Sequence, residues 1–299
     1  MIKYSIVRPG NNCRIELFCG DCIEGMSSHI EERSVDVIVT SPPYNIGVQY
    51  SSYNDKQPRD SYLAWIEEWA IATKRVLSED GSIFLNVGGK PSDPWVPIQV
   101  ADILRRHFNL QNVIHWIKSI AIDSTALGKG HNVNGDLSFG HYKPINSKAF
   151  VNDLHEYVFH FTHSGKLPID RLALGVPYQD KSNVKRWKAA AKDVRCRGNV
   201  WFIPYETIRN RDKQRPHPAS YPPRLAEMCL QLHGVRNDLL ALDPFMGLGS
   251  TAIACARLGV NCVGFEMDRE YHATSIKRVS EESCCQQILW TDENQDFSK

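Results

Sequence analysis

Short apolar runs alternate with helical patterns along most of this 299-residue chain. The helical segments carry apolar residues three and four positions apart, as at Leu63, Ile66 and Ala70. This alternation is typical of a mostly parallel, doubly wound α/β sheet, in which helices connect successive strands. Strands are expected at 13–19, 35–40, 82–87, 112–117, 155–161, 238–243 and 261–268, and helices at 60–77, 95–107, 221–234, 250–259 and after Glu270, with a short one between 20 and 34.

The composition is ordinary for a globular protein, with 42% hydrophobic and 23% charged residues. No apolar run approaches a membrane span, and the first residues lack the apolar segment of a signal peptide, so we expect a cytoplasmic protein. The nine cysteines, an odd number, favour reduced thiols over a disulfide framework. Cys19 and Cys22 form a C-x-x-C without a second ligand pair, so no metal site is expected.

Positive charge is concentrated in one part of the chain. Residues 166–224 contain 14 Lys and Arg against 5 Asp and Glu, a net charge of +9 in a chain whose total is +1. The densest stretch, 180–201, also contains Trp187. A polyanion such as nucleic acid would suit this segment, and a solvated surface helix is the alternative. Weak apolar patterning over 166–215 predicts an insertion in the sheet domain.

The expected strand 35–40 is followed at once by Ser41-Pro42-Pro43-Tyr44. Two prolines cannot continue a ladder of backbone hydrogen bonds, so they end the strand and fix the backbone where it leaves the sheet. Taken alone, this stretch could be no more than a strand-terminating turn.

A second strand end carries glycines. After Asp243, Gly247 and Gly249 allow tight turns before a helix that Ser250 opens. The next strand ends near Glu266 and Asp268, where a carboxylate can accept hydrogen bonds from both hydroxyls of a ribose. The third glycine of a dinucleotide site is absent, which favours a nucleoside ligand without a pyrophosphate. Because parallel strands share one carboxyl edge, both strand ends are expected to face a common crevice.

Four stretches, TSPPY, DPFMGLGST, GFEMD and RPHPASYPPRLAEMC, resemble the motifs of the S-adenosylmethionine-dependent DNA amino-methyltransferases. Their order is similar to that of the beta class, with the catalytic motif first, the donor motif last and a basic insertion between them. The resemblance covers roughly 13–278. It implies a Rossmann-like methyltransferase fold, with a catalytic domain made of 1–165 and 216–299 and a target-recognition insertion at 166–215.

The resemblance also implies a role for each matching residue. Ser41, Pro42, Pro43 and Tyr44 would be catalytic. Glu266 would hold the ribose of the donor, S-adenosylmethionine, which leaves as S-adenosylhomocysteine. The full set implied for donor binding is Asp21, Asp243, Phe245, Gly247, Gly249, Ser250, Thr251, Glu266, His217, Pro218 and Ser220.

A physical argument supports the catalytic role. The exocyclic amine of a base is a poor nucleophile, because its lone pair is delocalised into the ring. Ser41 Oγ and the Pro42 carbonyl can accept its two hydrogens and free that lone pair, and the prolines hold both acceptors in place. Tyr44 offers a ring on which an extruded base can stack. The chain has no Pro-Cys dipeptide, the nucleophile motif of carbon-5 cytosine methylation.

Basic residues in two segments are expected to contact DNA. One segment is the loop 123–149, too long to be a plain connection, and the other is the insertion. The residues are Lys143, Lys148, Lys181, Lys185, Arg186, Lys188, Arg195 and Arg197. His155 and Glu156 could form a general-base pair, but we interpret them as strand residues near the rim of the pocket. Trp65, Trp69 and Trp116 are expected in the core.

The sequence thus predicts a site-specific DNA methyltransferase of a restriction–modification or epigenetic system, located in the cytoplasm with the nucleoid. Cytosine N4 is the expected target, because Ser-Pro-Pro-Tyr usually accompanies it in the family and Asp-Pro-Pro-Tyr usually accompanies adenine N6. Adenine N6, an RNA or protein substrate, and an inactive DNA-binding module stay open. So do a cognate restriction endonuclease as partner, the recognition sequence, and the choice between monomer and homodimer. A NAD-dependent dehydrogenase would need the third glycine and a hydride-transfer partner, and we find neither.

Overall fold

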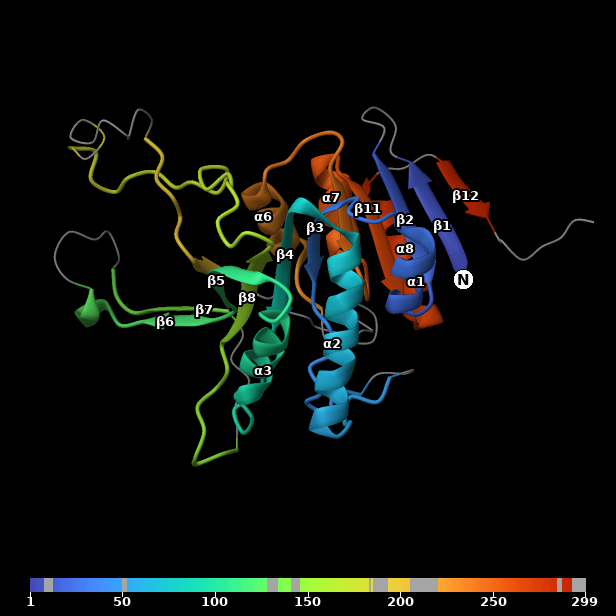
Figure 1. Cartoon of the computed structure of the whole chain (residues 1–299). Coiled ribbons are helices and arrows are strands. Elements are labelled where there is room, and N and C mark those ends of the chain that lie inside the picture. The colour runs from blue at the N-terminus through green and yellow to red at the C-terminus, as the bar shows by residue number, and fades with distance from the viewer. Residues whose placement is uncertain are drawn as a thin grey trace, which may run out of the picture.

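A computed structural model of the chain describes residues 1–7, 13–49, 53–127, 134–140, 146–182, 184, 193–204, 220–283 and 287–291. Within these residues, one ten-stranded sheet forms the centre of the molecule (Figure 1). Its strands are, in sheet order, β12 (Gln287–Thr291), β1 (Ile2–Val7), β2 (Arg14–Cys19), β11 (Asn261–Glu266), β10 (Leu240–Asp243), β3 (Val35–Thr40), β4 (Leu77–Val87), β8 (His155–Thr162), β5 (Asn109–Ile117) and β9 (Val200–Phe202).

The middle of the sheet is parallel. Strands β2, β11, β10, β3 and β4 all run in the same direction. On one side β8 pairs antiparallel with both β4 and β5, and on the other β1 pairs antiparallel with β2 and β12. The predicted mostly parallel, doubly wound α/β fold is therefore confirmed, with antiparallel strands added at both edges.

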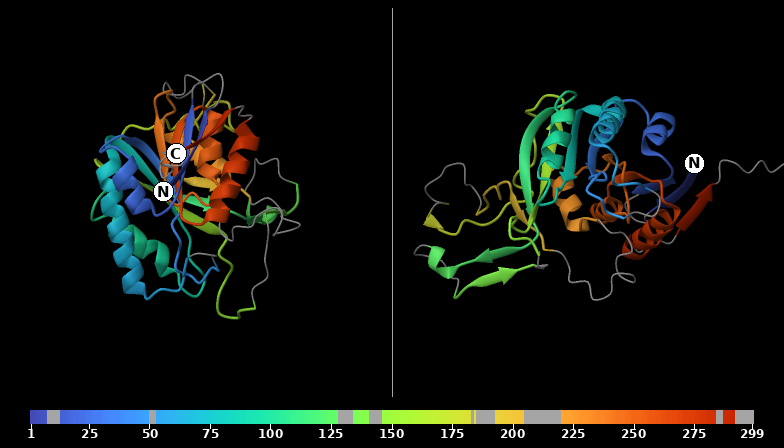
Figure 2. Two further views of the ribbon diagram at one scale, coloured as in Figure 1. Left: turned by 90° about the vertical axis from the view of Figure 1, so that its right-hand side faces the viewer. Right: turned by 90° about the horizontal axis from the view of Figure 1, so that it is seen from below.

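In the described part of the chain, three helices cover each face of the sheet. Helices α1 (Cys22–His29), α2 (Arg59–Val76) and α3 (Trp95–Leu104) lie on one face, and α6 (Pro223–His233), α7 (Ser250–Leu258) and α8 (Arg269–Ser283) on the other (Figure 1 and the right-hand view of Figure 2). Each interface is a hydrophobic cluster. Tyr62, Ile66 and Trp69 of α2, at helical spacing, are fully buried in the first, and Trp116 of β5 is buried in the second.

The strand order brings two distant segments of the chain together. Strand β10 lies between β3 and β11, so the carboxyl ends of all three are neighbours. Thr40, the last residue of β3, donates from Oγ1 to Oδ1 of Asp243, the last residue of β10, at 2.6 Å. The residues that follow these strands consequently start from adjacent points, although about 200 positions separate them in the sequence.

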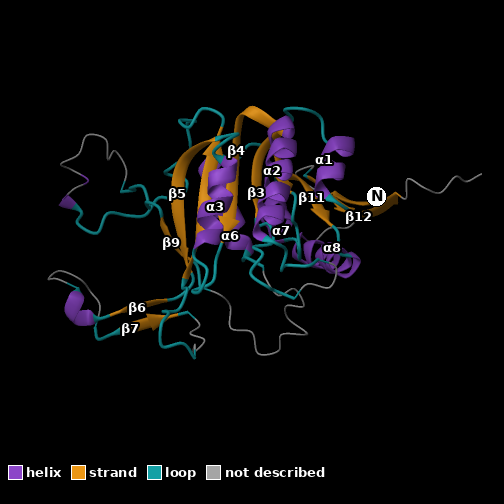
Figure 3. Cartoon of the chain, turned by 60° about the horizontal axis from the view of Figure 1, so that its bottom comes forward, coloured by secondary structure: helices purple, strands orange, loops and turns teal. Residues whose placement is uncertain are grey.

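A small hairpin projects from the sheet domain. It consists of β6 (Ile120–Ile122) and β7 (Leu137–Phe139), with a 3-10 turn at Ser124–Ala126 between them in the sequence, and lies beyond β5 and the edge strand β9 (Figures 2 and 3). Strand β7 lies within the long loop predicted over 123–149, and β6 lies directly before that loop. No sequence pattern indicates β6 or β7, because three residues are too few to establish an alternation.

The segment predicted as an insertion contributes to the main sheet. Strand β9 pairs with β5 in parallel, and its middle residue, Trp201, is 1% exposed. The division into 1–165 with 216–299 and an insertion at 166–215 stays a prediction. The structure adds that part of 166–215 packs into the core of the sheet domain.

Candidate active site

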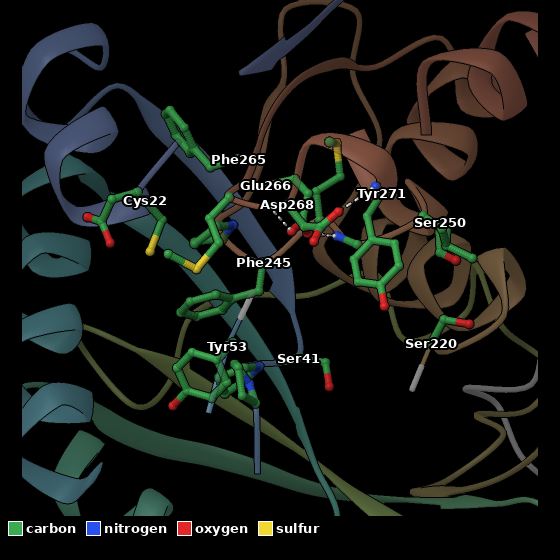
Figure 4. A pocket seen from close by; sticks show the side chains of 18 of the residues that line it. Cys22, Ser41, Tyr53, Ser220, Phe245, Ser250, Phe265, Glu266, Asp268 and Tyr271 are labelled. Atoms are coloured by element: carbon green, nitrogen blue, oxygen red, sulfur yellow. Dashed lines mark hydrogen bonds between the residues drawn. The ribbon is translucent and has the colours of Figure 1, made fainter. Parts of the chain in front are cut away.

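A large cavity opens at the carboxyl ends of β3, β10 and β11 (Figure 4). It encloses about 1010 Å³ of empty space, including the part open to solvent. Two segments border it: Ser41–Tyr44, named here the proline corner, and Pro244–Gly249 together with Glu266, named the glycine corner. All of these residues except Gly249 line the cavity. The structure therefore places the two corners that the sequence singled out around one cavity.

The loop after the proline corner is held by a buried carboxylate. Asp55, 2% exposed, accepts the backbone N–H groups of four consecutive residues, Asn45 to Val48, at 2.7 to 3.1 Å. Asn45 has a φ of 55°, a left-handed conformation that Asn tolerates better than most residues. Tyr62 of α2 donates its hydroxyl to the Pro43 carbonyl at 2.8 Å. These bonds fix the backbone on both sides of Tyr44.

Ser41 and Tyr44 belong to a hydrogen-bond chain that runs behind the cavity wall. Ser41 Oγ lies 2.8 Å from Tyr44 Oη, and Tyr44 donates to Glu156 Oε2 at 3.0 Å. Asn86 Nδ2 donates to Tyr44 Oη at 2.8 Å and to Glu156 Oε2 at 2.6 Å. Lys118 Nζ lies 3.1 Å from the other carboxylate oxygen, Oε1. The sequence does not predict Asn86 and Lys118 as site residues. For Glu156 it allows a general-base pair with His155, although we interpret both as strand residues near the rim of the pocket.

At the glycine corner, backbone N–H groups surround a carboxylate. Gly247 N donates to Glu266 Oε2 and Asp268 N donates to Glu266 Oε1, both at 2.8 Å. Burial raises the pKa of the Glu266 carboxyl to about 7. The loop is packed tightly on β11, since a Cβ on Gly264 would lie 2.5 Å from Met246 Sδ. Gly249 has a φ of 79°, which favours glycine there.

A buried polar cluster joins the two corners from below. Asp243, 1% exposed, accepts from Thr40, from Tyr221 Oη at 3.0 Å and from Phe245 N at 3.1 Å. Tyr221 Oη also lies 2.5 Å from Thr251 Oγ1. Burial raises the pKa of both Asp243 and Tyr221. Asp243, Gly249 and Thr251 therefore support the cavity from behind and are not among the residues that line it.

Two other carboxylates at the cavity cap the N-termini of helices. Asp21 accepts from the N–H groups of Ile23 and Glu24 at 2.9 and 3.0 Å and so caps α1. Asp268 accepts from Glu270 and Tyr271 N–H groups at the start of α8. Both acids line the cavity, so each combines a capping bond with a place in its wall.

Aromatic side chains form another part of the wall. Phe245 contacts the rings of Trp65 and Trp69, each at a centroid distance of 5.5 Å, and Tyr53 contacts Trp65 at 6.1 Å. Trp69 is fully buried, as expected, and so is Trp116. Trp65 differs from the expectation, because it is half-buried and lines the cavity with Tyr53 and Phe245.

Most of the predicted site residues fall into three groups. Those lining the cavity are Asp21, Ser41, Pro42, Pro43, Tyr44, Ser220, Phe245, Gly247, Ser250 and Glu266. Those supporting it from behind are Asp243, Gly249 and Thr251. His217 and Pro218, together with Lys143, Lys185, Arg186 and Lys188, lie outside the described residues.

The remaining predicted DNA contacts are exposed residues away from the cavity. Lys148, Lys181, Arg195 and Arg197 are all exposed. Lys181 forms an ion pair with Asp193, and Arg197 Nε donates to the Leu174 carbonyl at 3.1 Å. These bonds occupy part of the hydrogen-bonding capacity of both side chains, and their roles in DNA binding stay predictions. No helix in the described part of the chain is long and apolar enough to cross a membrane.

Comparisons with known proteins give a consistent result. The sequence matches the family N6_N4_Mtase, described as DNA methylase, over residues 35–277. It is 27% identical over 266 residues to the type II methyltransferase M.HpaI of Haemophilus parainfluenzae, covering 89% of this chain and 74% of that protein. It is 28% identical over 298 residues to the type II methyltransferase M.BglII of Bacillus subtilis, covering 94% and 71%.

Solved structures share the fold. The PvuII DNA methyltransferase, described as cytosine-N4-specific, superposes with a TM-score of 0.60 at 19% identity and covers 90% of this chain and 91% of that one. The M1.HpyAVI complex with SAM gives a TM-score of 0.51 at 20% identity, with coverages of 89% and 99%. The predicted Rossmann-like methyltransferase fold is confirmed.

Proposed function

The chain belongs to the N6_N4_Mtase family of DNA methylases, and from this premise we propose that it methylates the exocyclic N4 amine of cytosine within a specific sequence of duplex DNA. The family establishes a DNA amino-methyltransferase, and the choice of cytosine is the proposal. One observation carries it: the proline corner and the glycine corner open into the same cavity. One corner can grip an amine, and the other can hold a methyl donor beside it.

The cavity fits the donor, S-adenosylmethionine, on the chemistry of its lining. Glu266 presents a carboxylate that can accept from ribose hydroxyls, Phe245 offers an apolar ring, and Asp21 lies at the same cavity. Gly247, Ser250 and Ser220 line the remaining wall, with Thr251, Gly249 and Asp243 behind them. When bound, the donor supplies a methyl group on a positively charged sulfur. The chain's own residues need only bind it, orient it and exclude water.

The proline corner activates the amine. Ser41 Oγ lines the cavity and can accept one N–H, while the Pro42 carbonyl can accept the other. Both acceptors sit on a backbone held by two prolines, by Tyr62 and by Asp55, so little reorganisation is needed when the amine arrives. The nitrogen lone pair then points at the methyl carbon, and no covalent intermediate with the protein is required.

The target base must leave the duplex to reach these groups. The half-buried Tyr44 ring lines the cavity beside Ser41 and offers a stacking surface for an extruded base. Two features support cytosine as that base. The motif is Ser-Pro-Pro-Tyr, and the PvuII methyltransferase, which shares the fold, is described as cytosine-N4-specific.

We place the enzyme in a bacterial restriction–modification setting, in the cytoplasm with the nucleoid, where its substrate is duplex DNA. The relatives M.HpaI and M.BglII, both named type II methyltransferases, support this setting. A cognate restriction endonuclease is then the expected partner. The basic segment 166–215 and Lys148 are the proposed DNA contacts, through phosphates, whether the enzyme acts as a monomer or a homodimer.

Incubation with labelled donor and mixed-sequence duplex DNA tests the proposal. We expect label on the DNA, N4-methylcytosine in its nucleoside mass spectrum, and transfer by Ser41→Ala lowered roughly 10²- to 10³-fold. Label recovered as N6-methyladenine would reassign the base and leave the rest intact. Label on RNA or protein alone, or donor binding without transfer, would contradict the proposed function.

A further inference from the structure

We propose that Glu156 ends a hydrogen-bond chain that makes Ser41 an obligatory acceptor and carries away the proton that the amine loses. The proposal rests on the proposed function, because it needs an amine substrate at Ser41. Glu156, on β8, and Asn86, on β4, are 9% and 3% exposed and lie behind the proline corner. Neither lines the cavity, so both act through Tyr44 and Ser41 as positioning residues.

The direction of each hydrogen bond in the chain follows from the carboxylate. An ionised carboxylate only accepts, so the amide end 2.6 Å from Glu156 Oε2 must be the Asn86 nitrogen. Asn86 donates its second hydrogen to Tyr44 Oη. Tyr44 has one hydroxyl hydrogen. Glu156 Oε2 at 3.0 Å is a closer acceptor for it than the backbone carbonyl oxygen of Asn86 at 3.4 Å.

The polarity of Ser41 is then determined. With its hydrogen given to Glu156, Tyr44 Oη can only accept, so the 2.8 Å contact between the two hydroxyls must be donated by Ser41. The single hydrogen of Ser41 points away from the cavity, and a lone pair of Oγ is left toward it. An amine N–H entering the cavity therefore meets an acceptor, as amine activation requires.

The same chain runs in the right direction for the released proton. When the amine nitrogen forms its bond to the methyl carbon, the electron pair of the broken C–S bond stays on sulfur, and one N–H proton must leave the nitrogen. That proton passes to Ser41 Oγ as the Ser41 proton moves to Tyr44 Oη and the Tyr44 proton moves to Glu156 Oε2. The products are a neutral methylamine and a neutral Glu156 carboxyl, which returns its proton to solvent before the next turnover.

The side chains of this hydrogen-bond chain are closely packed. A Cβ on Gly88 would lie 2.9 Å from Glu156 Cγ and 3.0 Å from Tyr44 Cε2. Glycine at this position therefore lets the carboxylate and the ring approach. Lys118 Nζ, 3.1 Å from Oε1, supplies a counter-ion on the side of Glu156 away from Tyr44.

Single-turnover methylation of DNA carrying the site that the wild type modifies tests the proposal. The variants are Glu156→Gln, Tyr44→Phe, their combination, and Glu67→Gln as a control carboxylate that pairs with Arg106 and His107 away from the cavity. We expect Glu156→Gln and Tyr44→Phe each to lower the rate roughly 10- to 100-fold, as for loss of a hydrogen bond to a charged group. The double variant should be no slower than Tyr44→Phe alone, because both break the same chain.

Further readouts separate this role from a structural one. Donor affinity by calorimetry and the Tm should match the wild type in all variants, and Glu156→Asp should recover part of the rate. A Glu156→Gln rate within threefold of wild type, or additive losses in the double variant, overturns the proposal. Should Glu156→Gln lower the Tm markedly, Tyr44→Phe decides, and a wild-type rate there overturns it. A wild-type chain that methylates no DNA overturns the proposed function itself.

Discussion

At the glycine corner, backbone N–H groups surround the key carboxylate, whereas at the proline corner, side chains from separate strands meet the key hydroxyl. Glu266 is held by Gly247 N and Asp268 N, both close to the ends of β10 and β11. Ser41 is held through Tyr44 by Asn86 on β4 and Glu156 on β8. The first arrangement is local to two neighbouring strands, and the second extends across three.

This difference matches the two tasks. Binding a nucleoside donor needs fixed acceptors and close backbone approach, which glycines and strand ends provide. Activating an amine needs acceptors of defined polarity, and for a hydroxyl such as Ser41 a directed chain of side-chain hydrogen bonds can provide that polarity. The two corners should therefore respond to mutation in different ways, the proline corner in rate and the glycine corner in donor affinity.

The largest expected effect is at Ser41. Ser41→Ala removes the acceptor while leaving the cavity open, so we expect methyl transfer to fall by roughly 10²- to 10³-fold, as when one preorganised polar group is lost. Donor affinity by calorimetry should stay within about twofold of wild type, since Ser41 is not expected to contact the donor strongly. Loss of donor binding in this variant would erase the proposed separation of tasks.

The next effect is at Glu266. Because its pKa in the folded protein is about 7, the carboxyl is protonated below pH 7 and accepts poorly from ribose hydroxyls. Donor affinity of the wild type should thus fall as pH drops from 8 to 6. Glu266→Gln should weaken donor binding about 10- to 100-fold at pH 8, as expected for hydrogen bonds to a charged group, and should lack this pH dependence.

The stability of Glu266→Gln should change in the opposite direction to its donor affinity. A pKa raised above the ordinary carboxyl value means that burying the charge costs stability, and the cost appears in full once pH exceeds about 7. In the absence of donor, Glu266→Gln should therefore be more stable than wild type at pH 8, by roughly 1 to 3 kcal/mol in urea unfolding. Equal stability of variant and wild type at pH 8 would show that burying the Glu266 charge costs no stability. A pH profile of donor binding by Glu266→Gln that matches the wild type would show that Glu266 is not the group that titrates at the donor site.

The smallest effect is expected beneath both corners. Tyr221→Phe removes one donor from the buried Asp243 and should lower the free energy of unfolding by about 1 to 3 kcal/mol. Transfer rate and donor affinity should change less than in the two variants above, and to similar extents. Tyr178→Phe, in a half-buried position remote from the cavity, serves as control and should change stability by less than about 0.5 kcal/mol. A selective loss of either rate or affinity would show that Tyr221 serves one corner alone.

The sequence was informative where a function depends on neighbouring residues. Strand 35–40, the prolines after it, and the glycines and Glu266 at the other strand end are local patterns, and the structure places them as expected around one cavity. Asn86, Lys118 and Glu156 become partners only through the pairing of β4 with β8 and β8 with β5, which no local pattern specifies. The sequence analysis considered Glu156 as a possible general base with His155, but no local pattern indicates Tyr44 and Asn86 as its partners.

Other differences have the same origin. Trp65 is expected in the core because it is a large apolar residue, yet the helix face that it occupies borders the cavity beside Phe245. Strand β9 was missed because three residues within a basic segment show no pattern, although Trp201 is buried against β5. In each case a tertiary contact, and not the local sequence, decides the environment of the residue.

Single-molecule sequencing of DNA from cells expressing the chain tests the central claim most directly, with Ser41→Ala as the matched control. The claim is that one cavity brings an amine-gripping corner against a donor-holding corner. It predicts N4-methylcytosine at one defined sequence in cells with the wild type and unmodified cytosine at that sequence in cells with Ser41→Ala. Wild-type DNA without any methylated amine, or a signal equal to that of Ser41→Ala, would contradict the claim.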